Sequence, residues 1–245
     1  ESMPQGSTFS IYAYEKGETN LATTPLGAGT YEVQTGGKAT GNLSLYRGEY
    51  DLYLMSNNTN VATSLVNGSA TGENGYDCMY NTLKNVTVQP ETAGSNTMSV
   101  RMPSAFVRLG SLVELSVKGS TTQPVAVGDL KVSRITIKNV SSPLTYKLGT
   151  SDWDLAGQTF DQSYTVSSFS EPEQQSSPHD SDPVVLLPLD GSTPLEFEIV
   201  LSIYSKISGE FVWKDFTYYA KAPKALLKGM KYKFEFTLTF FGLLN

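Results

Sequence analysis

Few residues in this chain could carry acid–base or nucleophilic chemistry. It has one histidine, His179, and one cysteine, Cys78. His179 lies near Ser176, Ser177 and Asp180, but catalytic triads are assembled by tertiary geometry, and the chain has no Gly-x-Ser-x-Gly turn. We therefore expect a solvated loop histidine. No cation adjoins Cys78 in the sequence to activate its thiol, so we expect a buried structural cysteine.

The scarcity of these two residue types excludes whole classes of site. One cysteine cannot form an intrachain disulfide or a multi-cysteine metal site, and one histidine cannot supply a zinc site that needs two or three. The polar segment 56–60 could offer oxygen ligands to calcium, but it lacks the regular acidic spacing of a calcium loop. No Walker loop or dinucleotide-binding fingerprint is present. We expect no cofactor and no bound metal.

Two pairs of carboxylates are spaced as a hydrolase would need them. Asp152 and Asp154 flank a tryptophan, and Glu196 and Glu198 fall on one face of an alternating segment. Residues at i and i+2 of a strand could meet the separation of about 5 to 10 Å that a glycoside hydrolase requires. Carboxylates on the solvent face of an amphipathic strand are the ordinary alternative, so we rank a hydrolase third among the candidate functions.

Four aromatic residues could form a platform for sugars: Trp153, Trp213, Tyr218 and Tyr219. Aromatic residues in strands more often belong to the core. A surface carbohydrate-binding module is nevertheless the alternative function that these residues leave open.

Composition narrows the class of partner. The chain has 245 residues, of which 39% are hydrophobic and 17% charged, and its formal net charge is −6. An acidic protein is poorly suited to neutralise phosphates, so we expect no nucleic-acid partner and no docking to anionic headgroups. No run of 18 apolar residues is present, so we expect no transmembrane helix.

The elements that must position any site are predicted to be strands. Residues 232–240 alternate between apolar and polar, and residues 195–203 repeat the pattern. Shorter strands are expected at 8–14, 31–34, 42–46, 50–55, 85–89, 98–102, 112–118, 131–140 and 210–219. Glycine turns separate these segments, which is typical of a β-sandwich or barrel. Two short helical segments are expected, at 223–228, which Gly229 would end, and at 59–65.

Two polar segments suggest the domain organisation. Residues 90–97 are polar and rich in turn formers, and they fall where a first sandwich of roughly 100 residues would end. We therefore expect two all-β domains, residues 1–102 and 103–245. Residues 161–183 form a longer polar segment, which we interpret as a mobile loop and a candidate binding element.

Three stretches of the chain resemble the fimbrillin family of Bacteroidetes, which comprises type V pilus subunits and fimbrillin-like lipoproteins. Residues 6–14 (GSTFSIYAY) are similar to the first retained strand of that family. Residues 43–57 (LSLYRGEYDLYLMSN) contain a Gly-x-Tyr-Asp-x-Tyr hairpin that leads to a Ser-Asn loop, and residues 225–234 (ALLKGMKYKF) are similar to its approach to the last strands. The order and spacing of the three fit, and together they span most of the chain.

The resemblance implies a fold and a mode of assembly. The fold would be two tandem transthyretin-like, Greek-key β-sandwich domains, exported as a lipoprotein to the outer membrane. In pilus subunits of the family, an arginine- or lysine-specific protease removes an N-terminal strand, and a strand of the next subunit fills the groove, which is β-strand addition. By resemblance, the polymerisation strands here would contain Phe9, Ile11, Ala13, Tyr232, Phe234, Phe236, Leu238 and Phe240.

We therefore expect a structural or adhesive subunit of a cell-surface fimbria rather than an enzyme. Its partners would be other fimbrial subunits and a host or bacterial surface receptor, and only a lipid anchor upstream of this chain would contact the membrane. Lys16, the first basic residue, follows the first strand, a poor position for removing an earlier one. The chain ends soon after Phe241, which favours a tip or other terminal subunit over a stalk subunit.

Overall fold

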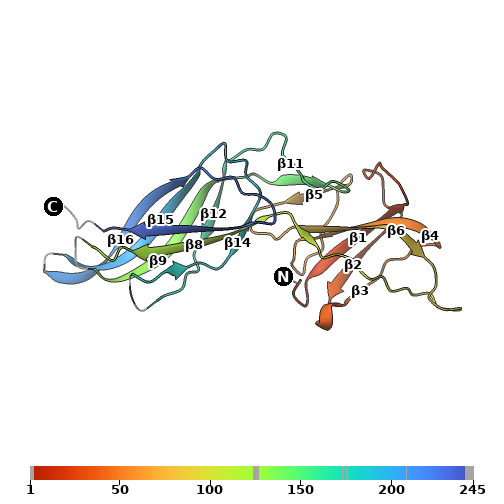
Figure 1. Ribbon diagram of the computed structural model, residues 1–245, viewed down its shortest axis with the longest axis horizontal. Coiled ribbons are helices and arrows are strands. Elements are labelled where there is room, and N and C mark those ends of the chain that lie inside the picture. Colours follow the sequence, from red (N-terminus) through yellow and green to blue (C-terminus); the bar gives the residue numbers. More distant parts are fainter. Residues whose placement is uncertain (1–2, 124–126, 173, 175, 208, 241–245) are drawn as a thin grey trace. The chain divides into compact units, whose positions relative to one another are not determined.

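The protein is built almost entirely of strands, as the sequence predicts. The structure, a computed structural model, describes residues 3–123, 127–172, 174, 176–207 and 209–240 (Figure 1). Strand makes up 52% of the chain, in several sheets that do not close, and the one helical element described is the 3₁₀ turn η1 (Thr35–Gly37). The expectation of an all-β chain is confirmed.

Contacts divide the chain into two compact units. Unit 1 comprises Glu1–Gly110 together with Pro143–Gly157, and unit 2 comprises Ser111–Ser142 together with Gln158–Asn245. The segment Pro143–Gly157 thus belongs to the first unit although it lies inside the sequence of the second. The predicted domains, 1–102 and 103–245, stay a prediction.

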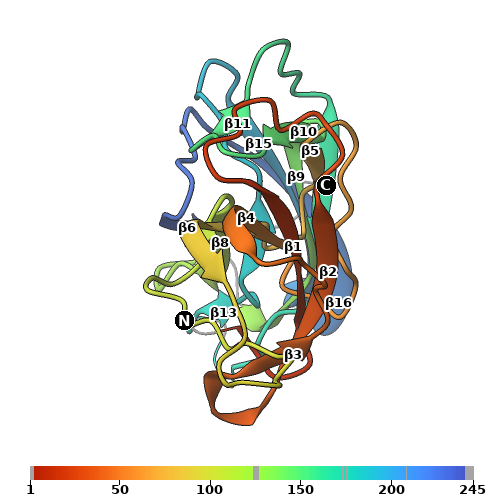
Figure 2. The same ribbon diagram turned by 90° about the vertical axis from the view of Figure 1, so that its right-hand side faces the viewer.

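The main sheet of unit 1 has six strands, and neighbouring strands are antiparallel. In spatial order they are β3 (Ala39–Gly41), β2 (Gly27–Val33), β1 (Thr8–Glu15), β4 (Gly48–Ser56), β6 (Met79–Val88) and β7 (Val107–Arg108). Figure 2 shows β1 between β4 and β2. Alternate residues of a strand point to opposite faces. The apolar residues Phe9, Ile11 and Ala13 of β1 therefore share one core with apolar residues of β2, β4 and β6.

A second, small sheet of unit 1 joins distant parts of the sequence. Its strands are β11 (Trp153–Asp154), β10 (Leu144–Lys147) and β5 (Ser69–Gly72). The ring of Trp153 lies directly over Gly72, where an added Cβ would be 2.1 Å from the indole. A glycine is therefore required there by space, and the indole Nε1 donates to the carbonyl oxygen of Leu109 at 2.8 Å.

Unit 2 consists of two sheets that share one core. One sheet has the order β12 (Gln162–Val166), β9 (Val127–Val140), β15 (Leu195–Ile207) and β16 (Glu210–Ala222). In the other, β8 (Ser111–Gly119) pairs on one side with β13 (His179–Asp180) and β14 (Val184–Leu186), and on its other side with β17 (Lys231–Leu238). Rings from both sheets meet in the core, where Phe197 lies 5.0 Å from Phe234 and 5.1 Å from Phe236.

Five local predictions are wrong. Residues 42–46 and 98–102 form no strand, and residues 59–65 and 223–228 form no helical turn. The segment 161–183 is not one continuous loop, because it contains the strands Gln162–Val166 and His179–Asp180. The chain after Gly41 instead passes over β2, so closely that a Cβ on Gly29 would be 2.2 Å from the carbonyl oxygen of Asn42. Leu226 forms an isolated bridge with Leu189, with both backbone bonds made, and its side chain is fully buried.

Candidate functional site

The first of the two predicted polymerisation strands lies inside its sheet. β1 is hydrogen-bonded along both edges, to β2 and to β4. Phe9, Ile11 and Ala13 are buried in the core of unit 1. On the opposite face of the strand, the hydroxyl groups of Tyr12 and Tyr14 donate to the backbone carbonyls of Thr63 and Leu21. Both edges and both faces of β1 are therefore occupied.

The second predicted polymerisation strand lies at the border of its sheet. The apolar residues of β17 are half-buried against the core of unit 2, and Phe240, just after the strand, is buried. The N–H of Phe240 donates to the Oε1 atom of Gln123 at 2.9 Å, which fixes the chain after β17. The inward residues are Tyr232, Phe234, Phe236, Leu238 and Phe240.

One edge of β17 carries backbone groups that no described strand pairs. The carbonyls of Met230 and Leu238 accept from the N–H groups of Leu112 and Ser120 beside β8. In a parallel pair each residue directs its N–H and C=O to the same edge, and the direction alternates along the strand. The odd-numbered residues therefore point away from β8, and this outward edge of β17 consists of Lys231, Lys233, Glu235 and Thr237.

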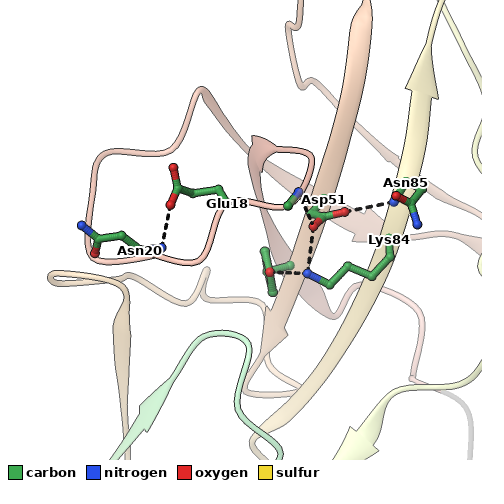
Figure 3. A network of polar contacts seen from close by, with 7 residues as sticks. Glu18, Asn20, Asp51, Lys84 and Asn85 are labelled. Carbon is green, nitrogen blue, oxygen red and sulfur yellow. Dashed lines mark hydrogen bonds and ion pairs between the residues drawn. The ribbon is translucent and has the colours of Figure 1, made fainter.

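A buried carboxylate anchors the irregular part of the first sheet. Asp51 accepts from the Lys84 ammonium at 2.9 Å, from the Asn85 N–H at 3.0 Å and from the Gly17 N–H at 3.2 Å (Figure 3). Burial alone would raise its pKa, but these three donors outweigh burial and lower the pKa of Asp51 below its ordinary value. The Tyr53 hydroxyl also contacts the Lys84 ammonium. With its donors all supplied by the chain, this network is structural.

One carboxylate of each predicted pair is held by a lysine. Asp154 pairs with Lys147 at 3.1 Å, and Glu198 pairs with Lys138 at 2.7 Å. Hydrogen bonds and these cations lower the pKa of both Asp154 and Glu198. A general acid of a glycoside hydrolase needs a raised pKa, so the geometry does not favour the hydrolase interpretation.

His179 is not the solvated loop residue that the sequence suggests. It lies in β13, is only 1% exposed, and its Nδ1 is 3.1 Å from the carbonyl oxygen of Ser170. Within the described residues its Nε2 has no hydrogen-bond partner, and Asp180 pairs with Lys233 at 3.2 Å. No serine hydroxyl is held by the imidazole there, and burial lowers the pKa of His179.

Cys78 is the buried structural residue that was expected. Its side chain is buried, its Sγ is 3.2 Å from the Oδ1 of Asn57, and burial raises the pKa of the thiol to about 12. A thiol of that pKa remains protonated at neutral pH and is a weak nucleophile.

The described part of the chain contains no cluster of three acidic, histidine or cysteine side chains that could hold a metal, and this includes the polar segment 56–60. Ser56 Oγ donates to the Thr8 carbonyl at 2.6 Å, and Asn58, at φ 55°, donates to Asp77. The segment is a turn closed by its own side chains.

The four aromatic residues proposed as a sugar platform are not brought together. Trp153 is buried in unit 1, and Tyr218 packs against Phe240 in unit 2. Trp213 and Tyr219 are exposed on β16. The sequence interpretation missed Tyr204 and Phe211. The ring of Tyr204 contacts the rings of both Trp213 and Phe211.

The comparisons with known proteins agree with the fold. The fimbrillin-like family profile matches residues 1–242. The chain belongs to the fimbrillin-like family. This is a family of structural and adhesion proteins rather than of enzymes, and the predicted resemblance is confirmed. No curated protein sequence matches this fimbrillin-like chain.

Several solved structures share the fold of this fimbrillin-like protein at low sequence identity. A candidate cell adhesion protein from Bacteroides fragilis aligns with a TM-score of 0.59 and 14% identity, over 100% of this chain and 83% of its own. Another from Bacteroides uniformis aligns with a TM-score of 0.56 and 13% identity, over 96% and 87%. A third, from Bacteroides eggerthii, aligns with 0.51 and 13%, over 98% and 81%. At these identities the likeness concerns the fold.

No helix in the described residues is long and apolar enough to cross a membrane.

Proposed function

We propose that this fimbrillin-like chain is a structural or adhesive subunit of a cell-surface fimbria, without catalytic activity, that associates with other fimbrial subunits by β-strand addition. Membership of the fimbrillin-like family supports the fimbrial and adhesive role. We further propose that its units are transthyretin-like Greek-key sandwiches and that it occupies a tip or other terminal position. A lipid anchor upstream of the chain would hold it at the outer membrane, and a surface receptor would be its external partner.

The observation that carries strand addition is the outward edge of β17. A strand at the border of a sheet presents unpaired N–H and C=O groups, which is the surface that an added strand recognises. In this chain those groups belong to Lys231, Lys233, Glu235 and Thr237, next to an apolar core that a donor strand could extend. β1, by contrast, is paired on both sides. We therefore place the acceptor surface at β17, whose own apolar residues remain against the core.

The test is a backbone substitution at this edge. Proline in place of Glu235 removes one outward N–H and leaves the bonds to β8 intact, because proline is tolerated on an edge strand where its nitrogen faces solvent. The full-length precursor would be treated with a trypsin-like protease and examined for SDS-resistant ladders. A terminal subunit takes a strand from another subunit, so the processed chain would also be mixed with processed subunits of the same fimbria. We expect ladders that contain the native chain and a clear loss of them with Glu235→Pro.

The matched control is Glu235→Ala, which removes the same exposed side chain but keeps the N–H. It should form ladders like the native chain, and all three proteins should unfold at similar temperatures. A native chain that enters no ladder in this mixture, or ladders that are equally strong with Glu235→Pro, would contradict strand addition at β17. A native chain that stays monomeric by itself would exclude only a stalk role.

A further inference from the structure

Three aromatic rings form an exposed cluster near the β15–β16 turn. Tyr204 lies between Trp213 and Phe211, with ring centroids 5.3 Å apart in both pairs and interplanar angles of 33° and 34°. Trp213 is 46% exposed and Phe211 is 42% exposed. We call Tyr204, Phe211 and Trp213 the aromatic platform. Large rings left open on a strand at a sheet border need a reason, because such borders otherwise attract aggregation.

Strand pairing and a glycine on the next strand position the rings of the aromatic platform. Tyr204 and Trp213 face each other directly across the β15–β16 pair. On the neighbouring strand β9, the position beneath the rings is Gly128, where an added Cβ would lie 3.0 Å from Tyr204 and 3.4 Å from Phe211. The absence of a side chain at Gly128 lets Tyr204 and Phe211 lie against the sheet.

Hydrogen-bonding groups adjoin the aromatic platform on the same face. The next row across the three strands consists of Lys131, Ser202 and Asp215. The Lys131 ammonium lies 5.5 Å from the centre of the Trp213 ring, and Ser202 Oγ donates to the Asp215 carboxylate. This row brings a cation, a hydroxyl and a carboxylate to the border of the rings.

The same face continues along β16 to a further exposed ring. Thr217 and Tyr219 follow Trp213 and Asp215 at alternate positions, so their side chains point to the same side. Tyr219 is 74% exposed. Tyr219 lies six positions after Trp213 along the strand, which is a distance of about 20 Å. The face therefore presents rings at both ends of a polar track.

The charges along this track balance. From the row of Tyr204 to the row of Glu196, the charged residues of β9, β15 and β16 on this face are Lys131, Arg134, Lys138 and Lys221 against Asp129, Asp215, Glu196 and Glu198. Several of them neutralise each other directly, as Lys138 does with Glu198 at 2.7 Å and Lys221 with Glu196 at 2.6 Å. Glu171, outside these strands, adds one negative charge beside Lys131 at 4.0 Å, so the face is nearly neutral and a ligand that matches it needs no large net charge.

We propose that the outer face of β9, β15 and β16 binds an extended neutral glycan, with the aromatic platform stacking on a pyranose ring. A pyranose has an apolar C–H face that suits an aromatic ring and hydroxyl groups that suit mixed donors and acceptors. The centre of a protein–protein interface is depleted of charged residues, whereas here Lys131 and Asp215 lie immediately beside Trp213. A polyhydroxylated ligand satisfies such groups, and an apolar protein surface does not.

The proposal goes beyond the fimbrial role and does not depend on assembly. The site lies on β16 and its neighbours, whereas the proposed acceptor edge lies on β17 of the other sheet of unit 2. Glu235→Pro should therefore bind glycan like the native chain. A native chain that enters no ladder but binds glycan would contradict strand addition alone, and a native chain that forms ladders but binds no glycan would contradict glycan binding alone.

The experiment is affinity electrophoresis of the full chain in native gels that contain mannan, galactomannan, xyloglucan or mixed-linkage β-glucan, with dextran sulfate as an anionic probe. We expect at least one neutral polysaccharide to retard the native chain. Trp213→Ala should weaken that binding by about tenfold or more, as the loss of a central aromatic contact does. Trp213→Tyr should restore part of it, and Tyr219→Ala should weaken it less.

The matched control is Tyr46→Ala, which removes an aromatic side chain that is 91% exposed in unit 1. It should be retarded like the native chain, and every variant should keep the native unfolding temperature. Lack of retardation in all neutral gels, retardation only by dextran sulfate, or binding unchanged in Trp213→Ala would overturn the proposal. A concentration-dependent dimer that Trp213→Ala dissociates would assign the face to self-association and overturn it as well.

Discussion

At the scale of single residues, Asp51 holds an irregular point of the first sheet in place. The register of β4 against β6 shifts between Tyr50 and Leu52, and Asn85 opposite it has a φ of 56°. The Asn85 N–H at this irregularity and the Gly17 N–H in the turn after β1 donate to the Asp51 carboxylate. Asp51 is only 3% exposed, and its side chain thus connects the turn after β1 to the irregular part of β6.

Substitution of Asp51 by alanine should destabilise the protein substantially. Two backbone N–H groups and the Lys84 ammonium would lose the charged acceptor that they share in part-buried bonds, and a hydrogen bond to a charged group contributes about 1.5–3 kcal/mol. We expect the free energy of unfolding to fall by about 2–4 kcal/mol, measured by urea denaturation followed by circular dichroism.

Glu49→Ala provides the control, because Glu49 forms an ion pair with Lys16 at a similar distance, 3.0 Å, on the surface. Exposed pairs of this kind contribute little, so the change should stay within about 0.5 kcal/mol. Equal effects of the two substitutions would show that the backbone N–H groups of Gly17 and Asn85 do not need the Asp51 carboxylate, which would contradict this prediction.

His179 should make stability depend on pH. Burial lowers the pKa of the folded imidazole below the value of about 6.5 that an unfolded chain has, and it outweighs the opposing influence of Asp129, Glu171 and Asp180. Below pH 6.5 the unfolded chain therefore binds a proton that the folded chain does not. The free energy of unfolding consequently decreases as the pH decreases. The contribution is complete above pH 6.5 and is lost as the pH drops toward the folded pKa.

The measurement is the urea midpoint of the native chain and of His179→Gln at pH 7.5 and pH 5.5. Carboxylates titrate in both proteins, so the difference between their pH slopes isolates the histidine. We expect the native chain to lose more stability than His179→Gln over this interval. Identical slopes would mean that the imidazole takes up its proton equally well in the folded state.

At the scale of elements, the alternation of apolar and polar residues was a reliable guide wherever a strand has one buried face. Residues 232–240 predict β17, whose burial alternates at every position, and residues 195–203 predict the first part of β15. The segments 8–14, 50–55 and 112–118 also coincide with observed strands. In these places the period of 2 and the packing of the sheet specify the same structure.

The sequence did not predict the secondary structure where tertiary contacts, and not the alternation of apolar and polar residues, determine the backbone conformation. Residues 42–46 alternate like a strand, but they cross over the glycines of β2 instead of pairing in a ladder. Residues 223–228 carry a helix-ending glycine, yet the backbone of Leu226 pairs with Leu189, more than 30 residues away along the printed sequence. Contacts between such distant residues leave no local signal.

The sequence also did not predict which strands pair with one another. Alternation assigns Tyr232 and Phe234 to a buried face, but it does not state that β17 runs parallel to β8 or that β1 has neighbours on both edges. The same limit applies to the aromatic platform. A Phe-x-Trp pattern near a Ser-Gly turn signals that Phe211 and Trp213 share a face, whereas Gly128 beneath the rings comes from a separate strand.

At the scale of the whole molecule, one short segment decides what unit 1 contains. The chain leaves unit 1 after Gly110, returns for Pro143–Gly157, and then leaves again. That segment supplies β10 and β11, two of the three strands in the small sheet of unit 1. It also supplies Tyr146 and Trp153, which are buried and contact each other. A division of the chain at one point would separate these residues from their unit.

A truncated chain of residues 1–110 should therefore not fold as unit 1 does in the complete protein. It would lack the partners of β5 and would expose the surface that Tyr146 and Trp153 cover. Fully burying a large apolar side chain contributes about 1.5–3 kcal/mol. The stability of a domain is about 5–15 kcal/mol, so the loss of two such side chains removes a large part of it. We expect a broad thermal transition at reduced temperature, followed by circular dichroism.

The decisive comparison restores the segment. Residues 1–110 joined to residues 143–157 by a flexible linker of about ten glycines and serines regain β10 and β11, since such a linker behaves as a random coil and adds no structure of its own. We expect a cooperative transition and blue-shifted emission from Trp153, the single tryptophan of that chain. If residues 1–110 alone unfold as cooperatively and at the same temperature, β10 and β11 are dispensable, and unit 1 is a domain of continuous sequence.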